Sequence, residues 1–286
     1  MSITSIKLLM KQYLHVALSV AASIFISSCQ HNGAIALHNF TKKNALHGES
    51  IATRQHEILI LSSKSLFIKD GQSLHIYLEG DGTPWFRGIE PSENPTSNSF
   101  IALKMMLQDK HPSLYLNRPC YGFITLPDNC NNALWTSARY SAEVINAMSD
   151  ALDQIKISTK AKNFTLIGHS GGASIAILLA KERKDIDKVI TIAGNLDHKA
   201  WTEHFGYDPL SHSQNPIDYL PLDKSIKRWH LFGELDKVIP LSIFEKAAEK
   251  DKHAIIKYEN FDHICCWLKE WPNIINKIVN DEIQNR

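Results

Sequence analysis

Residues 168–172 read Gly-His-Ser-Gly-Gly, which is the spacing of a nucleophile elbow. This segment follows an apolar run at 164–167 and precedes a helix-forming stretch at 173–181, so it has the strand-turn-helix context that an elbow requires. The turn is tight, and side chains at the flanking glycine positions would clash. Ser170 is therefore a candidate nucleophile. The alternative is a glycine-rich turn that caps a helix without chemistry.

A serine hydroxyl needs a base that takes its proton and an acid that orients the base. In hydrolases built on this elbow, the acid and then the histidine follow the serine along the chain. Asp236 lies in a turn after an expected strand at 228–232, and His263 lies in a loop after the last expected strand at 254–258. The order predicts a triad of Ser170, Asp236 and His263.

The acid position has competitors in the sequence. Asp197 follows the expected strand 188–193, and some enzymes of this type place the acid one strand earlier; Glu234 is a weaker candidate. We prefer Asp236 because a loop one strand before the histidine reaches its Nδ1 most directly. Among fourteen histidines, His263 alone follows the last expected strand at a strand-to-helix loop.

A tetrahedral intermediate also needs N–H donors for its oxyanion. Gly171 is expected to supply one, because it directly follows the nucleophile. The second is expected from the loop after the strand at 74–78, where two glycines flank Asp81. We assign the oxyanion hole to Gly171, Asp81 and Gly82, with the Asp81 N–H as the second donor. An ordinary glycine turn is the alternative at this loop.

Residues 1–28 have the features of a signal peptide. Lys7 and Lys11 precede an apolar stretch at 13–26 that is short for a membrane span. Removal of this segment lowers the 31 basic residues to 29, against 30 acidic residues. A nearly neutral chain argues against nucleic acid as a partner.

The end of this segment resembles the lipobox of bacterial lipoproteins, because small residues at 27–28 precede Cys29. The resemblance implies cleavage before Cys29 and a lipid on the new N-terminus. Gln30, rather than an acidic residue, follows the cysteine, which by the same resemblance implies the bacterial cell envelope, at an outer membrane facing the periplasm. The alternatives are an ordinary secretory signal and a buried N-terminal helix.

The other four cysteines are an even number, which in an exported chain indicates disulfides. Cys120 and Cys130 bracket a short loop, and its closure is the simplest of three possible connectivities. The neighbours Cys265 and Cys266 can bond only in a strained ring, and the alternative is that they are reduced and buried. No C-x-x-C pairs indicate a zinc site, and no metal is expected.

The remaining pattern predicts one domain over 56–286, behind a flexible tether at 29–55 that is polar and aperiodic. Expected strands at 57–62 and 66–68 turn through Asp70-Gly71 into a strand at 74–78, which predicts an opening antiparallel hairpin. Strands and helices then alternate. This predicts an α/β fold with a mainly parallel, doubly wound sheet.

Residues 194–227 interrupt this alternation with aromatic residues and prolines that lack a clean period. We expect a short lid-like insertion or a substrate wall, because it follows a strand at the carboxyl edge of the sheet. A packed surface excursion is the alternative. Three histidines with Asp197 could in principle bind a metal, but their spacing matches no defined ligand set; they are His198, His204 and His212.

The chain resembles the α/β-hydrolases, and more narrowly a family of bacterial α/β-hydrolase lipoproteins with a poorly defined substrate. The motifs that carry the narrower resemblance, besides the elbow, are residues 77–85 (Tyr-Leu-Glu-Gly-Asp-Gly-Thr-Pro-Trp), 118–120 (Arg-Pro-Cys), 135–141 (Trp-Thr-Ser-Ala-Arg-Tyr-Ser), 193–198 (Ala-Gly-Asn-Leu-Asp-His), and 262–263 (Asp-His) followed by Trp267. The match covers residues 57–271. One departure is Cys265 and Cys266, where a glycine before the tryptophan is more usual.

The resemblance implies that Ser170, Asp236 and His263 fall on catalytic positions, and that Gly171 and the loop 80–82 form the oxyanion hole. It implies a membrane-tethered serine hydrolase of esterase or lipase type, acting on a small-molecule or acyl substrate without a cofactor. Ester, thioester and amide bonds all fit this machinery. The alternatives are an inactive hydrolase-fold binding lipoprotein, and an aminopeptidase-like hydrolase in which Asp81 attracts a substrate amine.

Overall fold

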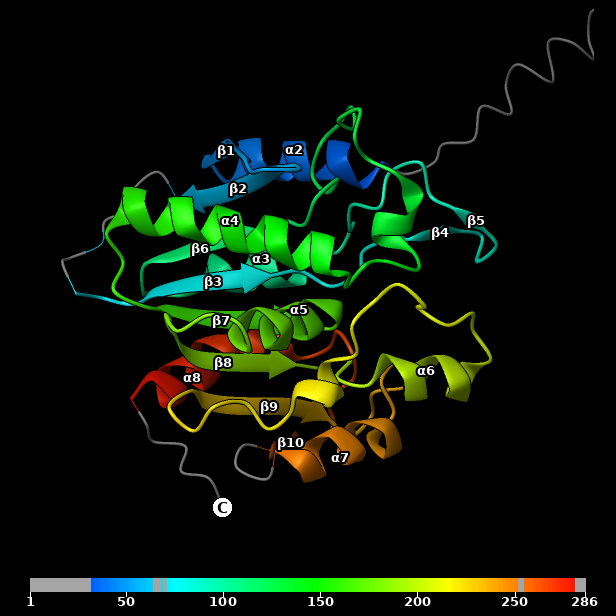
Figure 1. Cartoon of the computed structure of the whole chain (residues 1–286). Coiled ribbons are helices and arrows are strands. Elements are labelled where there is room, and N and C mark those ends of the chain that lie inside the picture. Colours follow the sequence, from blue (N-terminus) through cyan, green and yellow to red (C-terminus); the bar gives the residue numbers. More distant parts are fainter. Residues whose placement is uncertain (1–31, 64–67, 69–70, 252–254, 281–286) are drawn as a thin grey trace, which may run out of the picture. The chain divides into compact units, whose positions relative to one another are not determined.

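The computed structural model describes residues 32–63, 68, 71–251 and 255–280, and their main element is an eight-stranded sheet in the order β1-β2-β6-β3-β7-β8-β9-β10 (Figure 1). The strands are β1 (Leu46–Ala52), β2 (Glu57–Ser63), β3 (Leu74–Leu78), β6 (Ser113–Leu116), β7 (Phe164–His169), β8 (Ile186–Ile192), β9 (Lys227–Gly233) and β10 (Ile255–Tyr258), with β4 (Trp85–Phe86) and β5 (Glu90–Pro91) as a separate pair. The sheet is mainly parallel, as predicted, because every pair from β6 to β10 is parallel.

Helices cover both faces of the sheet (Figure 1). They are α2 (Gly33–Lys43), α3 (Ile101–Met106), α4 (Ala142–Thr159), α5 (Gly171–Ala180), α6 (His198–Phe205), α7 (Leu241–Lys250) and α8 (Trp267–Val279), with 3-10 turns η1 (Asn132–Trp135) and η2 (Pro216–Tyr219). Side chains of α4, α5 and α7 belong to one apolar cluster, and those of α2, α3 and α8 to the other. Successive strand residues alternate between the clusters, as Ile76 and Tyr77 do in β3.

The tether predicted at 29–55 is wrong for its described part. Residues 33–43 form α2, and residues 46–52 form β1, which pairs antiparallel with β2 at the edge of the sheet. Only two residues of β1, Leu46 and Ile51, are buried, so the polar composition that suggested a tether belongs to an exposed edge strand. The predicted signal peptide and the lipidation site Cys29 lie outside the described residues.

The predicted opening hairpin is also wrong. β2 pairs antiparallel with β1 and β6, whereas β3 pairs parallel with β6 and β7. β6 therefore lies between β2 and β3 in the sheet. Gly71 has a φ of 85°, and β2 and β3 run in opposite directions without pairing with each other. Most of the expected strand 66–68 and Asp70 lie outside the described residues.

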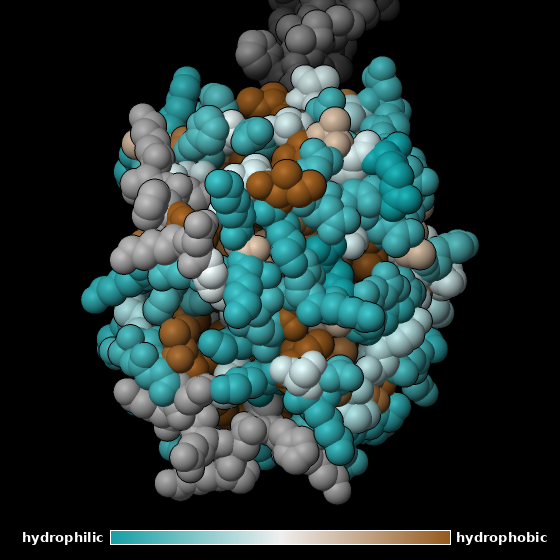
Figure 2. Space-filling view, turned by 60° about the vertical axis from the view of Figure 1, so that its left-hand side comes forward, coloured by the Kyte–Doolittle hydropathy of each residue, from teal (hydrophilic) through white to brown (hydrophobic). Residues whose placement is uncertain are grey.

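The surface in Figure 2 is mostly hydrophilic, with hydrophobic residues in small scattered groups. That distribution is ordinary for the exterior of a folded domain. Within the described ranges, no helix combines the length and the apolar content needed to cross a bilayer.

The structure joins Cys120 to Cys130, whose Cα atoms are 5.7 Å apart, as predicted. It also joins Cys265 to Cys266. The alternative that the latter pair is reduced and buried is wrong, because Cys265 is exposed and Cys266 is half-buried.

We expect protein recovered from an oxidising compartment to contain the Cys120–Cys130 bond, because closure of the loop between them restricts the unfolded chain. Peptide mass mapping without reduction should find the two cysteines in one cross-linked species. Replacement of both by serine should lower the free energy of unfolding by about 2–4 kcal/mol. Alkylation of both thiols without prior reduction contradicts the assignment.

Candidate active site

Ser170 lies at the sharp turn between β7 and α5, with φ 53° and ψ −120°. A positive φ is unusual for serine and is the strained backbone of a nucleophile elbow. The turn is close enough that a side chain at Gly168 would meet the backbone of Gly172, and one at Gly172 would meet the end of β3. The glycines of the motif are therefore required by close approach, as the sequence predicts.

The structure brings the three predicted triad residues together. His263 Nε2 lies 3.0 Å from Ser170 Oγ, and His263 Nδ1 lies 2.9 Å from Asp236 Oδ2. Because a carboxylate only accepts, Nδ1 carries the proton and Nε2 is left to accept from the serine. The buried Asp236 is fixed by its other oxygen, which accepts the amides of Val238 at 2.8 Å and Ile239 at 2.9 Å.

Asp197, the competing acid, has a different position. Its Oδ1 accepts from the Ala200 amide at 3.2 Å and from Asn215 Nδ2 at 2.7 Å, so it caps the N-terminus of α6. The weaker candidate, Glu234, is exposed. The acid that reaches His263 is Asp236.

The loop 79–82, which follows β3, lies against the nucleophile. A Cβ placed on Gly80 would be 3.2 Å from Ser170 Cβ. On the other side of Ser170, the amide of Gly171 begins α5 and therefore has no acceptor within the helix. Asp81 and Gly82 line the same cleft as Ser170, and Gly171 directly follows the serine in the chain.

The Asp81 side chain has internal partners. It accepts from Arg118 Nη1 at 2.8 Å, Arg139 Nη1 at 2.9 Å and the Tyr140 hydroxyl at 2.7 Å. Burial raises the pKa of this carboxyl, but the Arg139 and Arg118 guanidiniums outweigh burial and hold the pKa well below its usual range. The carboxylate is not free for a substrate amine, so the aminopeptidase-like alternative loses the residue on which it rested. Both arginines and Tyr140 lie in the motifs 118–120 and 135–141 that carry the resemblance, but sequence reasoning assigned them no role at the site.

His169 is a second residue that sequence reasoning missed. Its Nε2 lies 2.9 Å from the carbonyl oxygen of His263, and the two rings are 5.1 Å apart. Burial, together with the neighbouring His263, lowers the pKa of His169 to about 4. The neutral ring donates to that carbonyl and supports the loop of His263. The only sequence signal that could have identified His169 is its position within the elbow motif, directly before Ser170.

A cleft of about 310 Å³ opens over Ser170. Trp201 of α6, together with Val238 and Ile264 from the loops of the predicted acid and base, gives it apolar walls. Trp201 Nε1 donates to the Val238 carbonyl at 2.8 Å, and this bond links α6 to the loop that carries Asp236. The insertion 194–227, predicted as irregular, thus contains α6 and η2 and contributes one wall of the cleft.

Among the described residues, one group of side chains has metal-ligand types within reach of one another: His75, Asp109 and His111. The Asp109 oxygens already accept from His75 Nδ1 and the Tyr77 hydroxyl, both at 2.6 Å, and from the amide and Nδ1 of His111 at 2.9 Å. The group lies at the start of β3, away from the loop that contacts Ser170. Its donors satisfy the carboxylate without an ion, and we assign no metal to it.

No protein-family model and no curated protein sequence matches the chain. Solved structures do match. An esterase from Pyrococcus furiosus shares 14% identity at a TM-score of 0.59, over 84% of this chain and 95% of that one. An alpha-beta serine hydrolase homologue from Coxiella burnetii shares 12% identity at 0.52, over 83% and 97%. A puromycin hydrolase shares 10% identity at 0.59, over 82% of this chain and 38% of that one. With its mainly parallel sheet, this chain has the α/β-hydrolase fold.

Proposed function

We propose that this chain is a serine hydrolase that cleaves an ester, thioester or amide bond through an acyl-enzyme intermediate. The observation that carries the proposal is the placement of His263 between the Ser170 hydroxyl and the buried Asp236 carboxylate, at 3.0 Å and 2.9 Å. Such a chain of hydrogen bonds is the arrangement that activates a serine for attack.

In the first step, Ser170 Oγ attacks the carbonyl carbon of the substrate while its proton moves to His263 Nε2. Asp236 stabilises the imidazolium that forms and keeps its Nδ1–H directed at the carboxylate. The developing oxyanion accepts from the N–H groups of Gly171 and Asp81, with Gly82 beside them. The intermediate collapses when His263 protonates the leaving group.

In the second step, water attacks the acyl-serine and gives its proton to His263. The oxyanion forms again in the same place, and its collapse returns the proton to Ser170 Oγ and releases the acid. Each step uses residues of this chain alone, with no cofactor in the scheme. The apolar wall of Trp201, Val238 and Ile264 is suited to an apolar group of the substrate.

Two of the matched solved structures support hydrolysis as the reaction class, since one is an esterase and another a puromycin hydrolase. Their low identities leave the scissile bond open. The alternative is an inactive binding protein of the same fold. The first experiment must distinguish this alternative from an active enzyme.

Ser170→Ala should abolish hydrolysis of p-nitrophenyl acetate while the protein stays folded. Nucleophile and base act as one unit, so turnover should fall by about 10⁶-fold. The measurement is the rate of p-nitrophenolate release, with circular dichroism as the folding control. Equal turnover by folded Ser170→Ala and wild-type protein refutes the assignment, and an inactive wild-type protein favours the binding alternative.

Asp236→Asn should reduce kcat by about 10³–10⁴-fold, because an amide favours the wrong imidazole tautomer. Asp197→Asn is the matched control. Asparagine caps helices as well as aspartate does, so kcat should stay within about twofold of wild type. Steady-state kinetics of the two variants decide between the two acids. A larger fall in kcat for Asp197→Asn than for Asp236→Asn would assign the role to Asp197.

We further propose that a lipid on Cys29 holds the enzyme at a bacterial outer membrane, facing the periplasm. The support is the sequence at 1–30 alone. Several acyl chains together give stable attachment, whereas one chain gives only marginal binding.

The full-length chain expressed in a bacterium should incorporate labelled fatty acid and enter the detergent phase, whereas Cys29→Ser should do neither. Cys130→Ser is the matched cysteine control and should keep the label. A mature N-terminus other than Cys29, or no lipid on it, leaves a secreted hydrolase without a membrane anchor.

A further inference from the structure

We propose that Arg118 and Tyr121 are positioning residues for the oxyanion hole: they hold the peptide carbonyls of the loop 79–82 so that the N–H groups of Asp81 and Gly82 face Ser170. This inference rests on the proposed function, because it concerns the same intermediate. Neither residue contacts the reacting atoms. Both act through the backbone of the loop.

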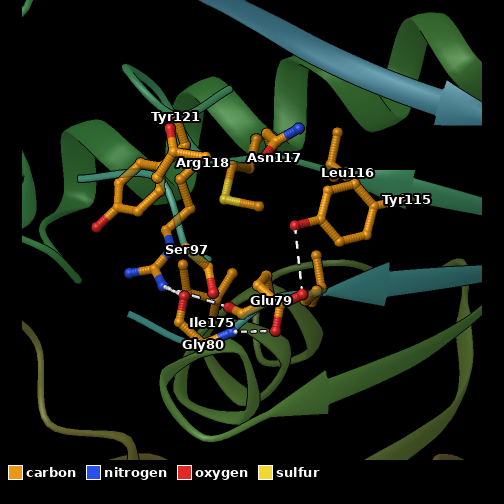
Figure 3. A pocket seen from close by; sticks show the side chains of 12 residues that line it. Glu79, Gly80, Ser97, Tyr115, Leu116, Asn117, Arg118, Tyr121 and Ile175 are labelled. Carbon is orange, nitrogen blue, oxygen red and sulfur yellow. Dashed lines mark hydrogen bonds between the residues drawn. The ribbon is translucent and has the colours of Figure 1, made fainter. Parts of the chain in front are cut away.

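The two side chains bind consecutive carbonyls of the loop. Arg118 Nη2 donates to the carbonyl of Glu79 at 3.3 Å and also to that of Gly80 (Figure 3). The Tyr121 hydroxyl donates to the carbonyl of Asp81 at 3.0 Å. Every peptide group from Glu79 to the start of Gly82 is thus held by its oxygen.

The geometry of the peptide bond converts this hold into an orientation of the amides. In a planar trans peptide, the C=O of one residue and the N–H of the next point in opposite directions. The bond to the Gly80 carbonyl therefore orients the N–H of Asp81, and the bond to the Asp81 carbonyl orients the N–H of Gly82. The Asp81 N–H is the second donor assigned to the oxyanion hole, and Gly82 is the residue assigned beside it.

Two cavities meet at the loop 79–82, and Glu79, Gly80 and Ser97 line both of them. Arg118 and Tyr121 line the small cavity, with Glu79, Gly80 and Tyr115 (Figure 3). Asp81 and Gly82 line the cleft, with Ser170 and His263. Because Arg118 and Tyr121 bind the Gly80 and Asp81 carbonyls, the N–H groups of Asp81 and Gly82 point away from these two side chains.

The residues that hold the loop are themselves fixed. Arg118 is buried, its guanidinium carbon lies 4.7 Å from the centre of the Tyr121 ring, and its Nη1 binds the Asp81 carboxylate at 2.8 Å. Tyr121 follows Cys120, so the disulfide to Cys130 closes the segment that carries it. This rigidity matters because an oxyanion donor must be aimed before the charge develops.

Tyr121→Phe is the variant that isolates the effect, since it keeps the ring against Arg118 and removes one hydrogen bond to the loop. Tyr115→Phe is the matched control: it removes another buried hydroxyl from the same cavity, one that lies 3.5 Å from the Glu79 carboxylate rather than at a peptide carbonyl. Arg118→Lys is the conservative change at the second position. Arg118→Met tests the loss of the charge, of both carbonyl bonds and of the ion pair with Asp81, provided that it folds.

The measurements are kcat and KM for p-nitrophenyl acetate, and Ki for a methyl trifluoromethyl ketone, which forms an oxyanion on the serine. Tyr121→Phe should lower kcat by about tenfold, as expected for one lost hydrogen bond, with KM within about twofold. Ki should rise by the same factor as kcat falls, because the ketone adduct shares the oxyanion of the transition state. Arg118→Met should lose about 10²–10³-fold in kcat, the cost of a lost oxyanion donor, and Arg118→Lys should recover part of it.

Equal kcat and Ki for Tyr121→Phe and Tyr115→Phe, in an active wild-type background, overturn the positioning role and leave the proposed function intact. A rise in KM with unchanged kcat overturns it as well, because that pattern marks a ground-state contact. A wild-type protein that neither hydrolyses the ester nor reacts with a fluorophosphonate overturns both proposals.

Discussion

The left-handed backbone at Ser170 is the constraint on which the rest of the site depends. A non-glycine residue held at φ 53° costs about 1–3 kcal/mol and persists only where its surroundings fix it. Here β7 and α5 are buried along their length, and both backbone groups of Ser170 are bonded to the segment that follows the elbow helix. Its amide donates to Ile192 at 2.9 Å, and its carbonyl accepts from Asn195 at 3.3 Å. The packing and hydrogen bonds of the sheet core thus stabilise the strained turn at Ser170.

The positions of the other site residues follow from parallel strands. Strands β3, β7 and β9 run in one direction, so the loops after them meet at one edge of the sheet. Those loops carry Asp81, Ser170 and Asp236, and the loop after β10 carries His263. Residues separated by 27 and 93 positions therefore come within hydrogen-bond distance of each other.

The parallel arrangement of the strands also explains how much of the site could be predicted from the sequence. The elbow is a local motif, and chain order assigns Asp236 and His263 without knowledge of the pairing of strands. Strand pairing itself was not accessible at the N-terminal edge: β1 has too few buried residues to show a period, and the insertion of β6 between β2 and β3 is a tertiary event. The partners of Asp81 were missed because Arg118 and Arg139 lie 37 and 58 residues away.

Ser170, Asp236 and His263 are surrounded by further buried polar residues that fix the neighbouring loops. Asp81 is ionised between two guanidiniums, and His169 is neutral beside the His263 loop. Isolated buried charges are costly, and here each has its counterpart. The carbonyls of the loop 79–82 accept from Arg118 and Tyr121, the His263 carbonyl accepts from His169, and Asp236 accepts from two amides.

The most direct measurement of the central claim is the location of the acyl group during turnover. Protein mixed with p-nitrophenyl acetate and quenched in acid within the first turnovers should gain one acetyl group, and peptide mass mapping should place it on Ser170. An acetyl group on another residue contradicts the acyl-enzyme account. The same conclusion follows if hydrolysis depends on Ser170 but no acyl adduct is found, even in Asp236→Asn protein, in which deacylation is slowed.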